Sequence, residues 1–193
     1  QKMMKNPTGP ERQPWPTQEP STIGRMMARR DATVTHSHQV CQDANAVYVV
    51  ALRYAIVSPR APREIYDYAM AWARTQELEP SVFERLVLAE REPPTSGKGW
   101  VLNALQASFY ALLHYSCAEG ISWSISIGAD TDTNAAITGG LLGAAHGLSS
   151  LPQPWVTAVI TSRPHAHLGR GRCQRPKWLW SCDALLVAEA LLH

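Results

Sequence analysis

The sequence has almost no net charge, no long apolar run and few cysteines. Its 193 residues carry a formal net charge of +2, which provides no general attraction to nucleic acid or to a membrane. The longest stretch of small apolar residues, 135–145, is too short to span a bilayer. We therefore expect no membrane partner, and any acidic ligand must be held by a local site.

Cysteine motifs and several common catalytic motifs are also missing. The four cysteines include no C-x-x-C pair, and the polar, Pro-rich N-terminus does not resemble a secretory signal peptide. We therefore expect reduced thiols in a cytoplasmic protein. No Ser-His-Asp motif and no phosphate-cradling glycine loop is visible, so neither of these signatures suggests a function.

The composition is that of a globular protein, with 45% hydrophobic and 18% charged residues. A chain of 193 residues suits one domain. Residues 1–20 contain five prolines and little apolar periodicity, which predicts a flexible or irregular N-terminal arm. Residues 21–193 are predicted to form the domain itself.

Apolar residues recur at helical spacing through most of this domain. The clearest stripes run from Val47 to Tyr54, from Ile65 to Trp72 behind a proline, and from Leu102 to Leu112. Residues 132–147 are also predicted to be helical, whereas 92–99 is predicted to be a loop. Because few runs resemble strands, the sequence predicts an all-α fold.

Helix ends can be predicted at two places, and one segment stays ambiguous. Ser81 with Glu84 predicts a capping box at the start of one helix. Ser181 is predicted to cap the last helix. Between residues 121 and 127, Ile, Trp and Ser alternate, which is compatible with either a strand or a short helix.

The clearest chemistry lies in Asp130, Thr131, Asp132 and Thr133, which follow Gly128. Two carboxylates two residues apart do not share one face of a helix. At a loop-to-helix junction they can converge, because a glycine allows the backbone to turn. Carboxylate and hydroxyl oxygens are the ligands that Mg²⁺ and Mn²⁺ prefer. An ordinary helix N-cap is the alternative, since Asp and Thr both cap helices.

Glycines continue along the predicted helix that follows. Gly139, Gly143 and Gly147 recur every four residues, with Gly140 beside them. Each glycine inside a helix costs about 0.5–1 kcal/mol relative to alanine, so a chain that keeps several must gain something. Close packing of neighbouring helices is the expected gain, and it would anchor this helix deep within a bundle.

The stretch 127–147 resembles the signature of the ADP-ribosylglycohydrolases, which is Gly-Gly-Asp-Thr-Asp-Thr followed by a helix rich in glycine and alanine. Ala129 replaces the second glycine, and because alanine is small we expect little effect. The resemblance covers residues 21–193 and implies an orthogonal helical bundle. Weaker matches follow in the family's order: Thr35-His36 before a helix, Gly99-Trp100-Val101 where the family has Gly-Tyr-Val, and Leu151-Pro152-Gln153-Pro154-Trp155 for a Pro-x-x-Trp element.

The resemblance implies that Asp130, Asp132 and Thr133 bind metal. In the family these positions hold one or both ions of a binuclear Mg²⁺ or Mn²⁺ site. The ions hold the ribose hydroxyls and position a water for attack at the anomeric carbon, which agrees with the general chemistry of metal-assisted hydrolysis.

The resemblance also implies that His36, Gly99 and Trp100 bind the substrate. The Trp100 ring would line the ligand cleft, where its face can stack on a base or a ribose. Two simpler explanations stay open, namely His36 as a capping or core histidine and Trp100 as a core residue.

One departure from the family is large. Its remaining metal ligands come from an earlier Thr-Asp-Asp-Thr motif, in an N-terminal part that also supplies an acidic catalytic residue. Neither that motif nor the family's opening Gly-Asp-Ala-x-Gly stretch is present. The sequence therefore assigns no catalytic residue and predicts an incomplete binuclear site. A truncated chain, a split or degenerate gene product and one member of a complementing pair all stay open.

Two functions follow from the resemblance. The first is a metal-dependent hydrolase that cleaves the glycosidic bond of ADP-ribosylated protein or a related ADP-ribose conjugate. The second is a catalytically incomplete protein that binds ADP-ribose, or a fragment that needs a complementing chain.

A basic and aromatic segment, 163–180, suggests a third function, because such segments can bind single-stranded nucleic acid. A solvated loop, with Trp178 and Trp180 packed on the bundle, is the favoured interpretation, since the rest of the chain is not basic. We therefore do not expect nucleic acid as a partner.

Overall fold

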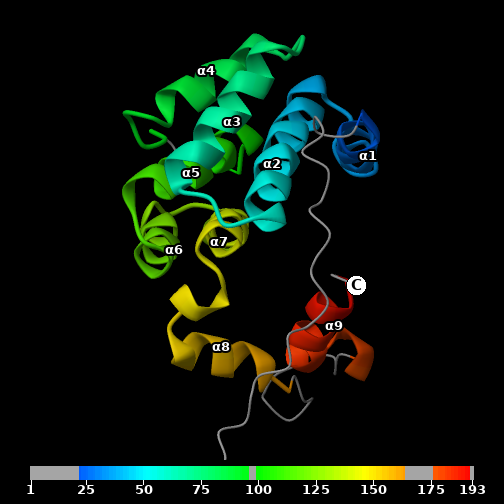
Figure 1. The fold of residues 1–193 in the computed structure, drawn as a ribbon, viewed down its shortest axis with the longest axis vertical. Helices are drawn as coiled ribbons and strands as arrows, with labels where there is room; N and C mark the ends of the chain where they lie inside the picture. Colours follow the sequence, from blue (N-terminus) through cyan, green and yellow to red (C-terminus); the bar gives the residue numbers. More distant parts are fainter. Residues whose placement is uncertain (1–21, 96–98, 164–175, 192–193) are drawn as a thin grey trace, which may run out of the picture.

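The computed structural model describes residues 22–95, 99–163 and 176–191, and these ranges contain helices but no strand. The predicted all-α class is therefore confirmed. The arm predicted for residues 1–20 lies outside the described residues. The α-helices, labelled in Figure 1, are α1 (Thr22–Ala32), α2 (Gln39–Val57), α3 (Pro62–Arg74), α4 (Pro80–Leu88), α5 (Val101–His114), α6 (Cys117–Ser126), α7 (Thr131–His146), α8 (Gln153–Ile160) and α9 (Ala184–Ala190).

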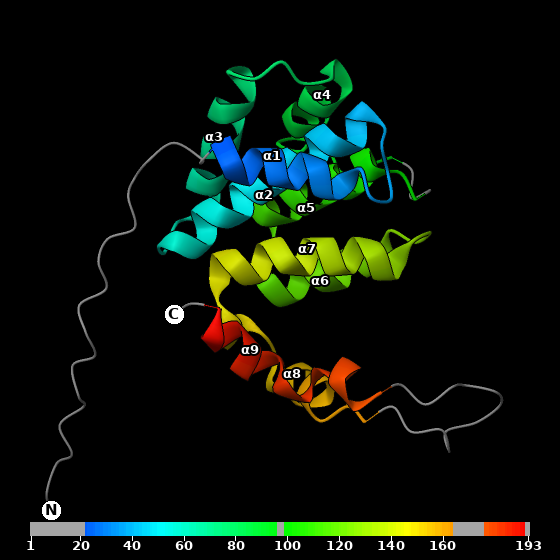
Figure 2. The same ribbon diagram turned by 90° about the vertical axis from the view of Figure 1, so that its right-hand side faces the viewer.

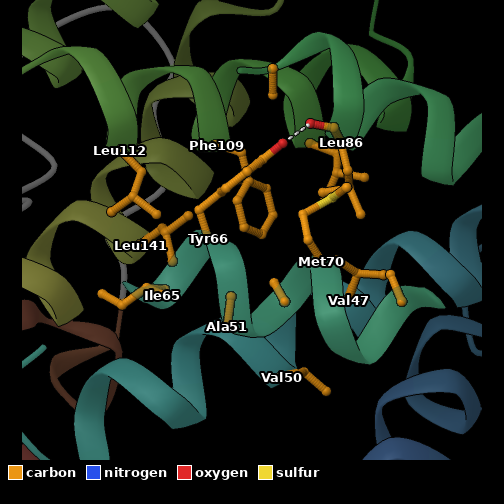
Figure 3. Close-up of a cluster of buried hydrophobic side chains, with 14 of the residues drawn as sticks. Val47, Val50, Ala51, Ile65, Tyr66, Met70, Leu86, Phe109, Leu112 and Leu141 are labelled. Carbon is orange, nitrogen blue, oxygen red and sulfur yellow. Dashed lines mark hydrogen bonds between the residues drawn. The ribbon is translucent and has the colours of Figure 1, made fainter. Parts of the chain in front are cut away.

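The hydrophobic core lies among α2, α3, α4, α5 and α7 (Figure 3). The stripe predicted on α2 supplies Val47, Val50 and Ala51, all of them buried. Tyr66 of α3 is buried as well, and its hydroxyl donates a hydrogen bond to the carbonyl oxygen of Leu86 at 3.0 Å. This bond satisfies the polar group that a tyrosine brings into an apolar core.

Helix α7 packs against α2, α5 and α6, as Figures 1 and 2 show. Two glycines permit the close approach. A Cβ atom on Gly140 would come within 2.7 Å of the Tyr48 hydroxyl oxygen on α2, and one on Gly139 would contact Ile121 of α6 at 3.5 Å. The Tyr48 hydroxyl donates to the carbonyl oxygen of Ile137 at 2.6 Å. Burial raises the pKa of Tyr48 to about 12, so this hydroxyl keeps its proton.

Two predicted helix starts are wrong. Helix α4 begins at Pro80 with Glu79 at its N-cap, so Ser81 does not cap it. A proline suits the first helical position because it has no N–H to satisfy and its φ is already helical. Helix α9 begins at Ala184, and Ser181 instead starts a short 3₁₀ helix before it.

The ambiguous segment 121–127 is helical, because it continues α6 as far as Ser126. A capping box starts this helix. The Glu119 carboxylate accepts hydrogen bonds from the Ser116 hydroxyl at 2.7 Å and from the Ser116 backbone N–H at 3.3 Å. These bonds also lower the pKa of Glu119. The alternation of Ile, Trp and Ser is therefore no sign of a strand here.

Helix α1 is held against α2 by partly buried polar contacts. Asp43 of α2 is fully buried, and its carboxylate pairs with the Arg29 guanidinium at 2.8 Å. The second carboxylate oxygen accepts the backbone N–H of Glu79 at 3.0 Å. The Asn45 side chain donates to the carbonyl oxygen of Ala28 at 2.6 Å. Together these contacts fix the end of α1 beside the start of α2.

Helices α8 and α9 lie beyond α7 and away from the core in both views (Figures 1 and 2). No residue of either helix is buried. Trp178, which we expected to pack on the bundle, is 78% exposed, so that expectation is wrong. Among the described residues, each helix is too short or too polar to span a bilayer.

The glycines of α7 provide a test of this packing. Gly140→Ala should lower the stability by about 1–2 kcal/mol, because the new methyl group displaces the Tyr48 hydroxyl and leaves a half-buried donor unpaired. Gly143→Ala should instead raise stability by about 0.5–1 kcal/mol, because a Cβ atom there meets nothing within 4 Å. Chemical denaturation measures both changes.

A Tyr48→Phe background serves as the control for this pair. Phenylalanine lacks the hydroxyl oxygen that the Gly140→Ala methyl group would contact. In that background, Gly140→Ala should cost little or become stabilising. If Gly140→Ala is equally costly in both backgrounds, the contact with Tyr48 is not the reason that α7 carries this glycine.

Candidate functional site

One pocket of about 500 Å³ opens where the end of α1 and the starts of α2, α5 and α7 meet. It brings together most of the residues that the sequence suggested. The predicted residues that line it are His36, Gly99, Trp100, Asp130 and Thr133. Asp132 does not line the pocket and is exposed.

The wall formed by α7 follows from helix geometry. Asp130, Thr133, Asn134 and Ile137 stand at positions i, i+3, i+4 and i+7, which share one helix face. Asp132 lies about 200° around the axis from Asp130, so its side chain leaves the helix on another side. Asn134 was missed by sequence reasoning, which searched the motif for ionisable groups and hydroxyls.

A strained turn carries the chain into this helix. Gly128 has a φ of 86° and Ala129 a φ of 59°. We predicted the turn at Gly128, and the structure confirms it. We expected Ala129 to have little effect because alanine is small. A left-handed φ nevertheless disfavours any residue with a Cβ atom by roughly 1–2 kcal/mol, so alanine at this position lowers the stability of the turn relative to glycine. The turn presents Asp130 to the pocket.

Asp130 and Asp132 are in contact although they leave the helix on different sides. Asp130 occupies the N-cap position of α7, but its side chain makes no capping hydrogen bond, which argues against the simple N-cap explanation. The backbone N–H of Thr133 lowers the pKa of Asp132, and a hydrogen bond with the Asp130 carboxyl group lowers it further. The two carboxyl groups therefore lie side by side at the edge of the pocket.

The start of α5 forms the opposite wall. A Cβ atom on Gly99 would come within 3.1 Å of the Asp130 Oδ2 atom, so a glycine leaves this carboxylate room. Trp100 follows at the N-cap of α5 and is 45% exposed. Trp100 is therefore not a core residue, and its ring is available at the pocket surface.

The third wall comes from the turn after α1 and from α2. His36 is exposed, and its Nδ1 atom lies 2.9 Å from the Thr35 hydroxyl oxygen. The cap of α2 is a different histidine, His38, whose Nδ1 accepts the backbone N–H of Val40 at 3.2 Å. His36 is thus neither the cap nor a core residue. Cys41 also lines this wall.

The pocket is acidic. Asp31 and Asp130 are its charged residues, and no Lys or Arg from the described residues lines it. Two carboxylates without a basic partner attract a cation, whether a metal ion or a positively charged part of a ligand. Sequence reasoning missed Asp31, because only the tertiary structure places the end of α1 opposite α7.

The donor chemistry at the start of α7 fits one hard divalent cation. Two carboxylates and the Thr133 hydroxyl are oxygen donors, and Mg²⁺ commonly binds one or two carboxylates while keeping several waters. Among the described residues, however, no group of three His, Cys, Asp or Glu side chains is placed to hold a metal ion. The described donors therefore fit a single ion and do not supply the ligands for a second one.

The described part of the basic segment, residues 163 and 176–180, does not line this pocket. Residues 164–175, which make up most of it, lie outside the described residues. The described part includes Arg163, whose guanidinium lies 5.7 Å from the ring centre of Trp180.

Comparison with known proteins gives three matches. Residues 15–176 match the family model described as ADP-ribosylglycohydrolase. The ADP-ribosylarginine hydrolase Tri1 of Serratia proteamaculans (strain 568) is 32% identical over 63 residues, which cover 32% of this chain and 17% of Tri1. A solved structure described as an ADP-ribosylglycohydrolase-related protein complex matches with a TM-score of 0.63 and 27% identity, over 69% of this chain and 47% of that one. The chain thus spans less than half the length of either relative.

The metal site can be tested by melting curves with Mn²⁺ and with EDTA. A metal ion that binds only the folded chain should stabilise it by about 2.7 kcal/mol at a hundredfold excess over its dissociation constant. Asp130→Asn and Asp132→Asn should each remove most of this gain, because asparagine keeps the shape but not the charge. An equal Mn²⁺ effect in native protein and in Asp132→Asn would exclude Asp132 from the site.

Asp183 provides the matched control. It occupies the N-cap of α9, so it also flanks a helix start, but it does not line the pocket. Asp183→Asn should leave the full Mn²⁺ effect in place. Loss of that effect in Asp183→Asn would show that Mn²⁺ acts through general surface charge.

Proposed function

This chain belongs to the ADP-ribosylglycohydrolase family, and we propose that it cleaves the glycosidic bond of an ADP-ribosylated protein or a related ADP-ribose conjugate. The observation that carries the proposal is the shared pocket. One cavity of about 500 Å³ is lined by five residues that the resemblance to the family assigns to the site. They come from three separate parts of the sequence and are His36, Gly99, Trp100, Asp130 and Thr133. That volume suits part of a nucleotide-sized ligand.

We propose Mg²⁺ or Mn²⁺ as the cofactor. Asp130, Asp132 and Thr133 would hold the ion at the edge of the pocket. A bound divalent ion orients substrate hydroxyls and makes a water more acidic. Asp130 and Asp132 lie side by side, and no Lys or Arg from the described residues lines the pocket beside them, which supports a cation as their partner.

The other walls suit the rest of the ligand. The exposed ring of Trp100 offers a face for stacking on a base or a ribose. Gly99 has no side chain, which leaves space beside Asp130. His36 and Thr35 present polar atoms from the wall formed by the turn after α1. These residues would bind and orient the conjugate.

The acidity of the pocket supports a cationic group next to the scissile bond. An arginine conjugate would carry such a group, and the name of the relative Tri1 specifies ADP-ribosylarginine. The diphosphate of ADP-ribose finds no Lys or Arg among the described lining residues. We therefore place the diphosphate toward the pocket mouth and the linkage inside.

A second function is favoured by one observation. The described residues hold no group of three metal-ligating side chains, so the described part of the chain has fewer ligands than a two-metal site needs. On this alternative, the chain binds ADP-ribose without turnover, or it completes its site with acidic residues from a complementing chain.

The activity test uses an ADP-ribosylated arginine peptide as the substrate. The native chain should release ADP-ribose with Mn²⁺ and should lose this release when EDTA is added, because the proposed water activation needs the ion. Chromatography of free ADP-ribose provides the measurement. Release that continues unchanged in EDTA would contradict the metal mechanism.

Calorimetry with ADP-ribose separates the two functions. Binding with no turnover under the same conditions favours the incomplete-site alternative. Turnover by the isolated chain rules that alternative out. If ADP-ribose neither binds nor is released, both proposals are wrong.

A further inference from the structure

Asn134 is a nearly buried residue whose amide has no partner among the described residues. Only 6% of its surface is exposed, and its side chain forms no hydrogen bond within the described part of the chain. Its amide atoms are not among the polar atoms that are fully closed off from solvent, so they are accessible from the pocket that the residue lines. Asn45, the other asparagine on the pocket wall, contrasts with it because its amide donates to the carbonyl oxygen of Ala28 at 2.6 Å. Asn134 therefore keeps its hydrogen-bonding capacity for the pocket.

A polar side chain on a nearly buried residue usually has a partner within the protein. Native proteins pair nearly all of their buried polar groups, whereas the Asn134 amide has no partner among the described residues. Asparagine is also a poorer helix former than alanine. Neither packing nor helix propensity explains an asparagine at this position of α7. Its side chain lines the pocket, so a group inside the pocket is the natural partner.

The surroundings of Asn134 define the chemistry of that partner. Thr133 precedes it, and Asp130 stands one turn earlier on the same helix face. An amide donates through its nitrogen and accepts through its oxygen, which matches neighbouring hydroxyls that can also do both. With no basic side chain among the described lining residues, a phosphate would find no charged partner here. A neutral sugar diol fits the site better.

We infer that Asn134 is a ligand-binding residue that recognises the hydroxyls of a ribose. The inference rests on the proposed function, since it takes ADP-ribose as the ligand. It adds a neutral contact in the pocket, distinct from the charged side chains of Asp130 and Asp132. ADP-ribose contains two riboses, and the one nearer the scissile bond is expected beside Asn134.

Thr138 supplies a matched control for the experiment. It lies one turn further along α7, is fully buried, and its hydroxyl likewise has no partner. Unlike Asn134, it does not line the pocket. Thr138→Val removes a buried unpaired polar atom from the same helix without touching the site.

Calorimetry in the presence of Mn²⁺ then compares ADP-ribose with ADP, which lacks the second ribose. Asn134→Ala should bind ADP-ribose roughly three- to tenfold more weakly, which corresponds to the loss of one hydrogen bond between neutral groups. ADP affinity should change less. Thr138→Val should bind both ligands like the native chain. Melting curves should show that neither variant is less stable than the native chain, and that Mn²⁺ stabilises Asn134→Ala as it does the native protein.

The outcomes separate the inference from the proposed function. Native affinity for ADP-ribose in Asn134→Ala would overturn the inference while leaving the function intact. An equal loss in Thr138→Val would overturn it too, because the effect would then come from α7 in general. Equal weakening of ADP and ADP-ribose would also overturn the inference, because the contact would then not be to the ribose that ADP lacks. Absence of ADP-ribose binding by the native chain would contradict the proposed function and the inference with it.

Discussion

The close approach of α7 to α2 is the contact on which the site depends. The Tyr48 side chain of α2 lies directly against Gly140 of α7, and its hydroxyl reaches the carbonyl oxygen of Ile137. This contact fixes the rotation of α7 about its axis. Once that rotation is set, the face that carries Asp130, Thr133 and Asn134 must point toward the end of α1 and the start of α5. A rotation of one residue, about 100°, would remove this face from the pocket.

The pocket collects features that the packing of the core does not explain. Asp130 and Asp132 place two carboxyl groups side by side, Ala129 adopts a left-handed φ, and Asn134 leaves its amide unpaired toward the pocket. The left-handed φ costs stability on its own, and the other two features leave polar groups available to a ligand. Their concentration at one end of one helix is expected of a binding site, where a ligand supplies the missing partners. The core around Tyr66 shows the opposite behaviour, because its buried hydroxyl is paired within the protein.

Much of this arrangement could be predicted from the sequence, and the failures have physical causes. Apolar periodicity located α2, α3 and α5, and the Asp-Thr-Asp-Thr motif located the start of α7. Ser81 was predicted to cap α4 because its pattern is local, but Pro80 suits the first helical position better. Asn134 and Asp31 were missed because their importance depends on tertiary structure, which brings α1 opposite α7. The roles of all these pocket residues in binding stay predictions.

The central claim is that this pocket binds ADP-ribose, and Cys41 reports on it directly. Its thiol lines the pocket, Cys182 is exposed away from it, and Cys117 is buried. Alkylation rates at each cysteine, followed by mass spectrometry with and without ADP-ribose, therefore test occupancy of the pocket within one molecule. The account predicts that ADP-ribose with Mn²⁺ slows alkylation of Cys41 and leaves Cys182 unchanged. Binding of ADP-ribose without protection of Cys41, or equal protection of both cysteines, would contradict it.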